Sequence, residues 1–215
     1  MNYNYKDRYL LTVSARYDGS SRLAPGHKWV LFPSAALAWR VKEESFLKDV
    51  DCLSNLKLRL GWGITGNTAI DPYKTQGNLE YGRYSYGSNG VLAFYQKEMP
   101  NPNLSWEKTE QWNAGIDFGF LNGRIGGSVD LYLQNTNDLL MDRQLPIVSG
   151  FGNVTTNIGQ IRNKGLEVTL NTVNIDTKDF KWTTDFMFSV NKEGSWNSIT
   201  GKSTTKEING LSASP

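Results

Sequence analysis

The sequence predicts an all-β fold in which antiparallel, up-and-down strands form part of a large transmembrane β-barrel. Three observations support this prediction: apolar and polar residues alternate in seven segments, a tight-turn sequence joins two long alternating segments, and the connections are alternately long and short. Alternation with a period of two gives each strand one apolar and one polar face. A barrel with lipid outside and water inside needs this pattern.

The central hairpin surrounds Asn122-Gly123, two residues that tolerate the positive φ of a type I′ turn. Residues 111–120 and 124–134 alternate without interruption on either side of it, and both segments exceed the usual strand length of about 5–6 residues. Their apolar faces carry Trp112, Ala114, Ile116, Phe118, Phe120, Ile125, Gly127, Val129, Leu131 and Leu133. Long alternating strands with a tight turn are typical of membrane barrels.

Five further segments show the same alternation: residues 8–18, 29–41, 56–65, 166–171 and 180–190. The first has Tyr9 and Tyr17 at the two ends of its apolar face, which is where the aromatic girdles of a membrane strand lie. Pro33 lacks an N–H group, so we expect it near a strand start or at a bulge. A half-buried strand of a soluble sandwich also alternates, and this remains the alternative interpretation.

The lengths of the connections alternate along the chain. Long loops follow the first, third and fifth strands, over residues 19–28, 66–104 and 138–161. The second, fourth and sixth strands are followed on the other side by a link over residues 42–55 whose helical spacing predicts a short helix, by the Asn122-Gly123 turn, and by residues 174–179. Outer-membrane barrels have long extracellular loops and short periplasmic turns. The alternation therefore favours a membrane barrel whose long loops lie outside the cell.

The end of the chain lacks this pattern. Residues 193–215 are polar and aperiodic, so the sequence predicts a partial barrel over residues 1–191 and a truncated polar loop or tail over residues 192–215. The residues after Met1 have no apolar stretch typical of a signal peptide, which an outer-membrane protein requires. We therefore expect the chain to be an internal part of a longer protein.

Composition argues against several functions. Cys52 is the only cysteine and His27 the only histidine, and neither has the sequence context of a catalytic or metal-binding residue. No phosphate-binding glycine motif occurs, and no run of about 18 apolar residues predicts a membrane helix. The net charge is +2 without a basic cluster, so no nucleic-acid partner is expected. We expect neither an enzyme nor a cofactor or metal site.

The second long loop, residues 66–104, is rich in aromatic residues. Because sugars bind with their apolar faces on aromatic rings, the sequence offers these tyrosines as candidate substrate contacts: Tyr81, Tyr84, Tyr86 and Tyr95. The alternative is that they pack within the loop or belong to the outer girdle. The polar faces of the strands would form the inner wall of the barrel. We expect its charged groups to pair mainly with one another rather than to mark a substrate path.

Several stretches resemble a known family. YLLTVSARYDGSSRLAPGHKWVLFPSAALAWRV, LSNLKLRLGWGITGN, NPNLSWEKTEQWNAGIDFGFLNGRIGGSVDLYLQNTNDLL and NIGQIRNKGLEVTL resemble, in this order, the barrel of SusC/RagA-type TonB-linked outer-membrane transporters of Bacteroidetes. The resemblance runs from about Tyr9 to about Asn191. It implies that the chain is an open wedge of about seven strands from a barrel of the 22-stranded type with a plugged lumen.

The same resemblance implies a function and partners. The family imports glycan or peptide fragments through the outer membrane, together with a SusD-like surface lipoprotein. An inner-membrane TonB complex supplies the energy through an N-terminal plug, which this chain does not contain. The alternative from another class is a soluble or surface-displayed β-sandwich that binds glycans through its loop aromatics.

Overall fold

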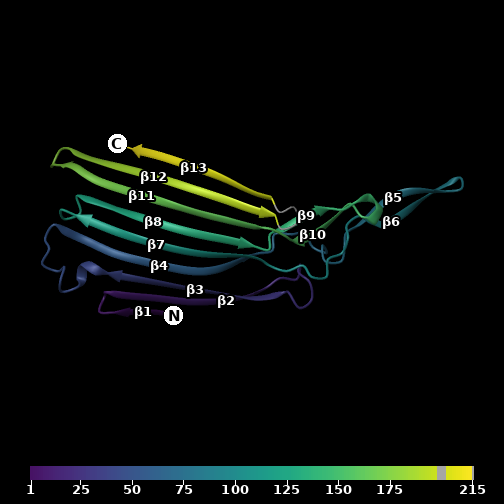
Figure 1. Cartoon of the computed structure of the whole chain (residues 1–215), viewed down its shortest axis with the longest axis horizontal. Coiled ribbons are helices and arrows are strands. Elements are labelled where there is room, and N and C mark those ends of the chain that lie inside the picture. The colour runs from purple at the N-terminus through teal and green to yellow at the C-terminus, as the bar shows by residue number, and fades with distance from the viewer. Residues whose placement is uncertain (198–201, 215) are drawn as a thin grey trace.

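The structure, a computed structural model, describes residues 1–197 and 202–214. Nine strands form one antiparallel sheet in the order β1-β2-β3-β4-β7-β8-β11-β12-β13 (Figure 1). They are β1 (Asn2–Tyr5), β2 (Tyr9–Gly19), β3 (Trp29–Arg40), β4 (Leu53–Asn67), β7 (Glu107–Phe120), β8 (Ile125–Asn137), β11 (Gln160–Asp176), β12 (Lys181–Asn197) and β13 (Lys202–Ser214). The up-and-down order is the one the sequence predicts, and the sheet is an open wedge of a barrel.

The sheet contains two strands that the sequence analysis missed. Strand β13 pairs with β12 from Lys202 opposite Asn197 to Ser214 opposite Asp185. The prediction of a loop is therefore wrong for residues 193–197 and 202–214, and its remaining residues, 198–201 and 215, lie outside the described part of the chain. Strand β1 pairs with the start of β2 through a turn in which Lys6 and Asp7 both have φ of 53°. Ladder hydrogen bonds join backbone groups, so a polar segment without alternation pairs once a neighbouring edge is free.

The central turn is longer than predicted. Strands β7 and β8 close at Phe120 opposite Ile125, which leaves four residues in the turn instead of two. Asn122 and Gly123 have positive φ, as their sequence predicts, and Leu121 also has φ of 53°. Backbone N–H groups of Gly123 and Arg124 donate to the carbonyl groups of Phe120 and Leu121, respectively.

The long and short connections lie at opposite ends of the sheet (Figure 1). We call these the loop end and the turn end. At the turn end, the predicted helical link is only a 3₁₀ turn, η1 (Val41–Glu43), followed by turns. At the loop end, the predicted irregular segments contain two hairpins, β5–β6 (Leu79–Tyr86, Asn89–Gln96) and β9–β10 (Leu140–Gln144, Asn153–Asn157), with η2 (Ile147–Ser149) between β9 and β10. No helix in the described part of the chain is long and apolar enough to cross a membrane.

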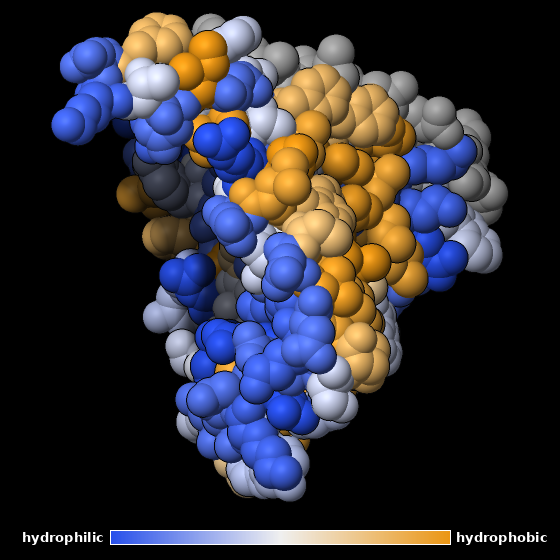
Figure 2. All heavy atoms as spheres, turned by 90° about the vertical axis from the view of Figure 1, so that its left-hand side faces the viewer, coloured by the Kyte–Doolittle hydropathy of each residue, from blue (hydrophilic) through white to orange (hydrophobic). Residues whose placement is uncertain are grey.

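The two faces of the sheet follow the predicted alternation. Rows of paired residues cross the strands, for example Leu60 opposite Ala114 and Ala114 opposite Leu131. Leu60 is 58% exposed and Leu131 54% exposed, so within the described residues no second sheet covers this apolar face, and the alternative of a closed sandwich does not hold. Figure 2 shows the hydrophobic residues gathered in a continuous band along one side of the molecule. We call this the outer face, and the opposite one the inner face.

A small core lies at the loop end. It consists of Leu23, Phe32, Leu104 and Trp106, which are all buried. Phe32 and Trp106 meet edge to face with ring centroids 5.3 Å apart, and the indole N–H of Trp106 donates to the Lys28 carbonyl at 3.0 Å. The β3–β4 ladder begins at Ser34, directly after Pro33, which lacks an N–H group. This core fixes the first long loop against the start of β7.

Candidate functional site

The candidate tyrosines lie on the β5–β6 hairpin, which extends beyond the sheet at the loop end (Figure 1). Its register pairs Glu80 with Tyr95, Tyr84 with Val91 and Tyr86 with Asn89. Because paired residues share a face and neighbours along a strand alternate, Tyr84, Tyr86 and Tyr95 lie on one face of the hairpin. Tyr81 pairs with Phe94 and lies on the other face. The structure therefore groups three of the four candidates and separates the fourth.

The face of the hairpin that carries Tyr84, Tyr86 and Tyr95 is open to solvent. Gly82 pairs with Ala93 between Tyr95 and the two other tyrosines, and a Cβ atom at Gly82 would lie 3.6 Å from Tyr95 Cε1, so the Tyr95 ring lies beside the glycine. Tyr84, Tyr86 and Tyr95 are 62%, 77% and 51% exposed. These rings are not packed within the loop, so their faces are accessible to a ligand. The other face is also exposed, with Tyr81 at 71%.

Hydrogen bonds orient one of the three rings. The Tyr95 hydroxyl donates to Glu80 Oε2 at 3.1 Å, and Lys97 Nζ lies 3.1 Å from Glu80 Oε1. The hydrogen bonds from Lys97 and Tyr95 hold the pKa of Glu80 below its ordinary value of 4.5. The bond to Glu80 in turn raises the pKa of Tyr95 above 10.0. At neutral pH the hydroxyl therefore keeps its proton and remains a donor to the carboxylate.

An ionic cluster around buried Lys74 and its partner Glu98 lies at the base of this hairpin. Lys74 Nζ lies 2.6 Å from Glu98 Oε1 and 4.0 Å from Asp142 Oδ2 of β9. Burial by itself lowers the pKa of Lys74, but its hydrogen bond to Glu98 and the nearby carboxylates outweigh this effect and raise it. The backbone of Glu98 also forms an isolated parallel β-bridge with that of Asn153 in β10. The cluster connects the second and third long loops, so the hairpin is anchored at its base.

The inner face carries the charged wall that the sequence predicts. Arg59 donates to Asp117 through Nε at 2.9 Å and Nη2 at 2.7 Å, and Nη2 also lies 2.8 Å from Asp130. Lys57 Nζ lies 3.8 Å from Asp117, and Arg16 Nε lies 2.7 Å from Asp18. These groups pair with one another, as expected for a filled barrel wall.

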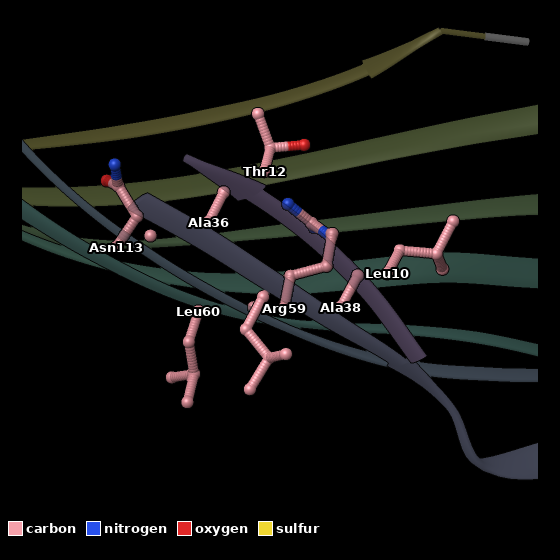
Figure 3. A pocket seen from close by; sticks show the side chains of 10 residues that line it. Leu10, Thr12, Ala36, Ala38, Arg59, Leu60 and Asn113 are labelled. Atoms are coloured by element: carbon pink, nitrogen blue, oxygen red, sulfur yellow. The ribbon is translucent and has the colours of Figure 1, made fainter. Parts of the chain in front are cut away.

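A shallow hollow of about 240 Å³ lies beside Arg59 on this wall (Figure 3). Small residues form its floor: Ala36, Ala38, Gly61 and Gly115. Leu10, Thr12 and Asn113 surround it with Arg59. Sequence reasoning placed Arg59 and Asn113 on the inner face but could not find the hollow, because it depends on small residues meeting across three strands. Among the described residues, no group of three or more His, Cys, Asp or Glu side chains lies close enough to hold a metal ion.

Comparison with known proteins agrees with this architecture. Residues 1–213 match the family model described as TonB dependent receptor-like, beta-barrel. TonB-dependent receptor SusC of Bacteroides thetaiotaomicron is 48% identical over 192 residues, which cover 85% of this chain and 19% of that protein. TonB-dependent receptor P26 of Formosa agariphila is 39% identical over 192 residues, with 89% of this chain and 19% of that protein covered. The chain therefore spans about a fifth of the length of these relatives.

Solved structures share the fold as well. The RagAB peptide importer in its "open-open" state superposes with a TM-score of 0.83 at 29% identity, covering 94% of this chain and 22% of that one. Its "closed-closed" state gives a TM-score of 0.81 at 30% identity, covering 91% and 21%. Members of this family are transporters, so the chain is not an enzyme. It belongs to the TonB-dependent receptor-like β-barrel family and is part of the barrel of a SusC/RagA-type transporter.

Proposed function

We propose that the transporter containing this chain imports oligosaccharides across the outer membrane, and that the β5–β6 hairpin contacts them as they enter. The observation that carries this proposal is the exposed face formed by Tyr84, Tyr86 and Tyr95. The C–H faces of sugar rings bind to flat aromatic surfaces, and the tyrosine hydroxyls supply polar contacts at the edges.

The same proposal includes the partners of the complete transporter. A SusD-like surface lipoprotein would cover the loop end, where the hairpin projects, and the TonB complex would act through a plug outside this chain. The chain itself contributes wall and loops. Its inner face offers paired charges around Arg59, which suit contact with a plug.

The test uses the full-length transporter in a strain that grows on an oligosaccharide as its sole carbon source. Tyr84→Ala, Tyr86→Ala and Tyr95→Ala should each weaken oligosaccharide binding by about three- to ten-fold, since an aromatic contact contributes about 0.5–1.5 kcal/mol. The matched control is Tyr81→Ala, which removes an equally exposed ring from the opposite face. Equal effects of Tyr81→Ala and Tyr84→Ala on binding would contradict the proposal.

A peptide is the second candidate substrate, because the structures that superpose on this chain are described as a peptide importer. Isothermal titration of the same variants with a mixture of short peptides distinguishes the two. If peptides bind and lose affinity in the Tyr84→Ala variant while oligosaccharides do not bind, the peptide assignment replaces the oligosaccharide one.

A further inference from the structure

Three cations lie on the outer face of the sheet, where an apolar surface is expected. The register places Leu133 opposite Lys164 and Lys164 opposite Lys192. The adjacent row toward the turn end contains Leu131, Leu166 and Val190, which belong to the apolar band. Arg162, two residues from Lys164, points to the same face. We call Arg162, Lys164 and Lys192 the outer basic cluster.

The cluster lies at the upper border of the apolar band. On β4 and β7, the row that contains Lys164 continues through Trp62 and Trp112, whose ring centroids lie 5.9 Å apart. Tryptophan is enriched at the boundary between the hydrocarbon and the headgroups. The basic residues lie on the loop side of Leu166 and Val190, and all three are exposed. The cluster therefore lies at the level of the lipid headgroups on the side that carries the long loops.

A groove joins the cluster to the apolar band. It has a volume of about 530 Å³, and the two lysines line it together with residues of three strands. The lining residues are Leu131, Tyr132, Leu133, Lys164, Gly165, Leu166, Val190 and Lys192. A lysine pair at one end of an otherwise apolar groove matches a molecule with an anionic head and a hydrocarbon chain.

The described side chains near Arg162 and Lys164 leave the charge of these two residues in place. Glu110, on the same face of β7, accepts hydrogen bonds from the indole N–H groups of Trp62 at 2.8 Å and Trp112 at 3.1 Å. Arg162 Nε donates to the neutral side chain of Asn135 at 2.7 Å. Among the described side chains, no carboxylate pairs with Arg162 or Lys164.

We propose that the outer basic cluster binds the phosphorylated headgroup of an anionic lipid of the outer leaflet, with an acyl chain in the adjoining groove. Lys164 and Lys192 contact a phosphate at the end of the groove, and Arg162 contacts it from the loop side. Basic side chains at a membrane surface attract anionic headgroups in this manner. The inference rests on the proposed outer-membrane location and is independent of the substrate that the transporter carries.

The test measures lipid retained by the full-length transporter. The protein is incubated in detergent with bis-phosphorylated lipid A and transferred to phosphatidylcholine nanodiscs, and retained lipid A is quantified by mass spectrometry. In the Lys164→Gln/Lys192→Gln variant, affinity should fall roughly five-fold for each lysine removed. The matched control, Lys178→Gln/Lys181→Gln, removes two exposed lysines at the turn end and should retain lipid A like the wild type.

Further arms identify the chemistry. Removing the phosphates from lipid A should reduce its retention by the wild type to the level that the double glutamine variant shows for intact lipid A. The Lys164→Arg/Lys192→Arg variant, which keeps both charges, should retain lipid A like the wild type. Undiminished retention in the double glutamine variant would overturn the proposal, as would equal loss in the control or complete displacement of lipid A by millimolar inorganic phosphate. A heat-dependent shift in gel mobility verifies that each barrel is folded. Substrate binding is assayed separately, so failure of the proposed import function is distinguishable from failure here.

Discussion

Arg59 of β4 and Asp130 of β8 form an ion pair across the strand that lies between them, with Nη2 2.8 Å from Oδ1. The intervening strand β7 contributes Gly115, which pairs with Arg59 on one side and Asp130 on the other. A Cβ atom at Gly115 would lie 2.4 Å from Asp130 Oδ1 and 2.8 Å from Arg59 Nη2. The glycine thus lets one guanidinium group join three strands of the inner wall.

Replacing this glycine should destabilise the wall. In the full-length transporter, Gly115→Ala should lower the free energy of unfolding by about 1–3 kcal/mol, because overpacking forces the ion pair apart. Gly61→Ala is the matched control, since its Cβ would meet only Asn113 Cβ at 3.9 Å. Urea unfolding followed by tryptophan fluorescence measures both variants. Equal midpoints for the two would show that the ion pair tolerates the methyl group.

The orientation of the barrel is testable by cysteine labelling. Ser88 lies in the turn of the β5–β6 hairpin at the loop end, and Asn122 lies in the β7–β8 turn at the other end. In a cysteine-free background that includes Cys52→Ser, a membrane-impermeant maleimide applied to intact cells should modify Ser88→Cys and leave Asn122→Cys unmodified. Permeabilised cells provide the control, in which both sites should react. The reverse pattern in intact cells would place the long loops in the periplasm.

The Lys74–Glu98 pair should determine how firmly the second long loop is held. Their side chains are 10% and 13% exposed, and Glu98 Oε2 is buried without a hydrogen-bond partner among the described residues. Lys74→Met would leave a buried carboxylate without its cation, at a cost of about 1–3 kcal/mol. We expect faster cleavage within residues 68–106 when intact cells are treated with proteinase K. Lys97→Met removes an exposed lysine of the same loop and should change the cleavage rate less.

The β5–β6 hairpin should be most ordered at intermediate pH. Glu80 has a lowered pKa, so its contribution is present above the ordinary value of 4.5 and is lost as pH falls through its lowered pKa. Tyr95 has a raised pKa, so its contribution is present below 10.0 and is lost as pH rises through its raised pKa. Hydrogen exchange of a peptide covering residues 79–96, corrected for intrinsic rates, should show greatest protection between these limits. The Glu80→Gln variant should lose the decline in protection at acidic pH.

Much of this fold was predictable because side-chain alternation is a local property. The stripe from Leu56 to Ile64 and the apolar positions around the central turn identify the apolar outer face without any knowledge of neighbouring strands. The connections between these segments likewise predict that the strands follow one another up and down in the sheet. Strand β13 was not predictable in this way, because its polar sequence pairs only where the free edge of β12 is available.

In the candidate site, too, some features follow from the local sequence and others only from strand pairing. The sequence by itself determined that aromatic residues gather in the second long loop, that the chain has one apolar and one polar wall, and that it resembles a SusC/RagA-type barrel. Only the tertiary structure decided that Tyr84, Tyr86 and Tyr95 share a face while Tyr81 does not, since this follows from the register of β5 and β6. It also decided that Arg59 reaches Asp130 and that Lys164 lies beside Lys192, because both contacts join residues that are close only across paired strands.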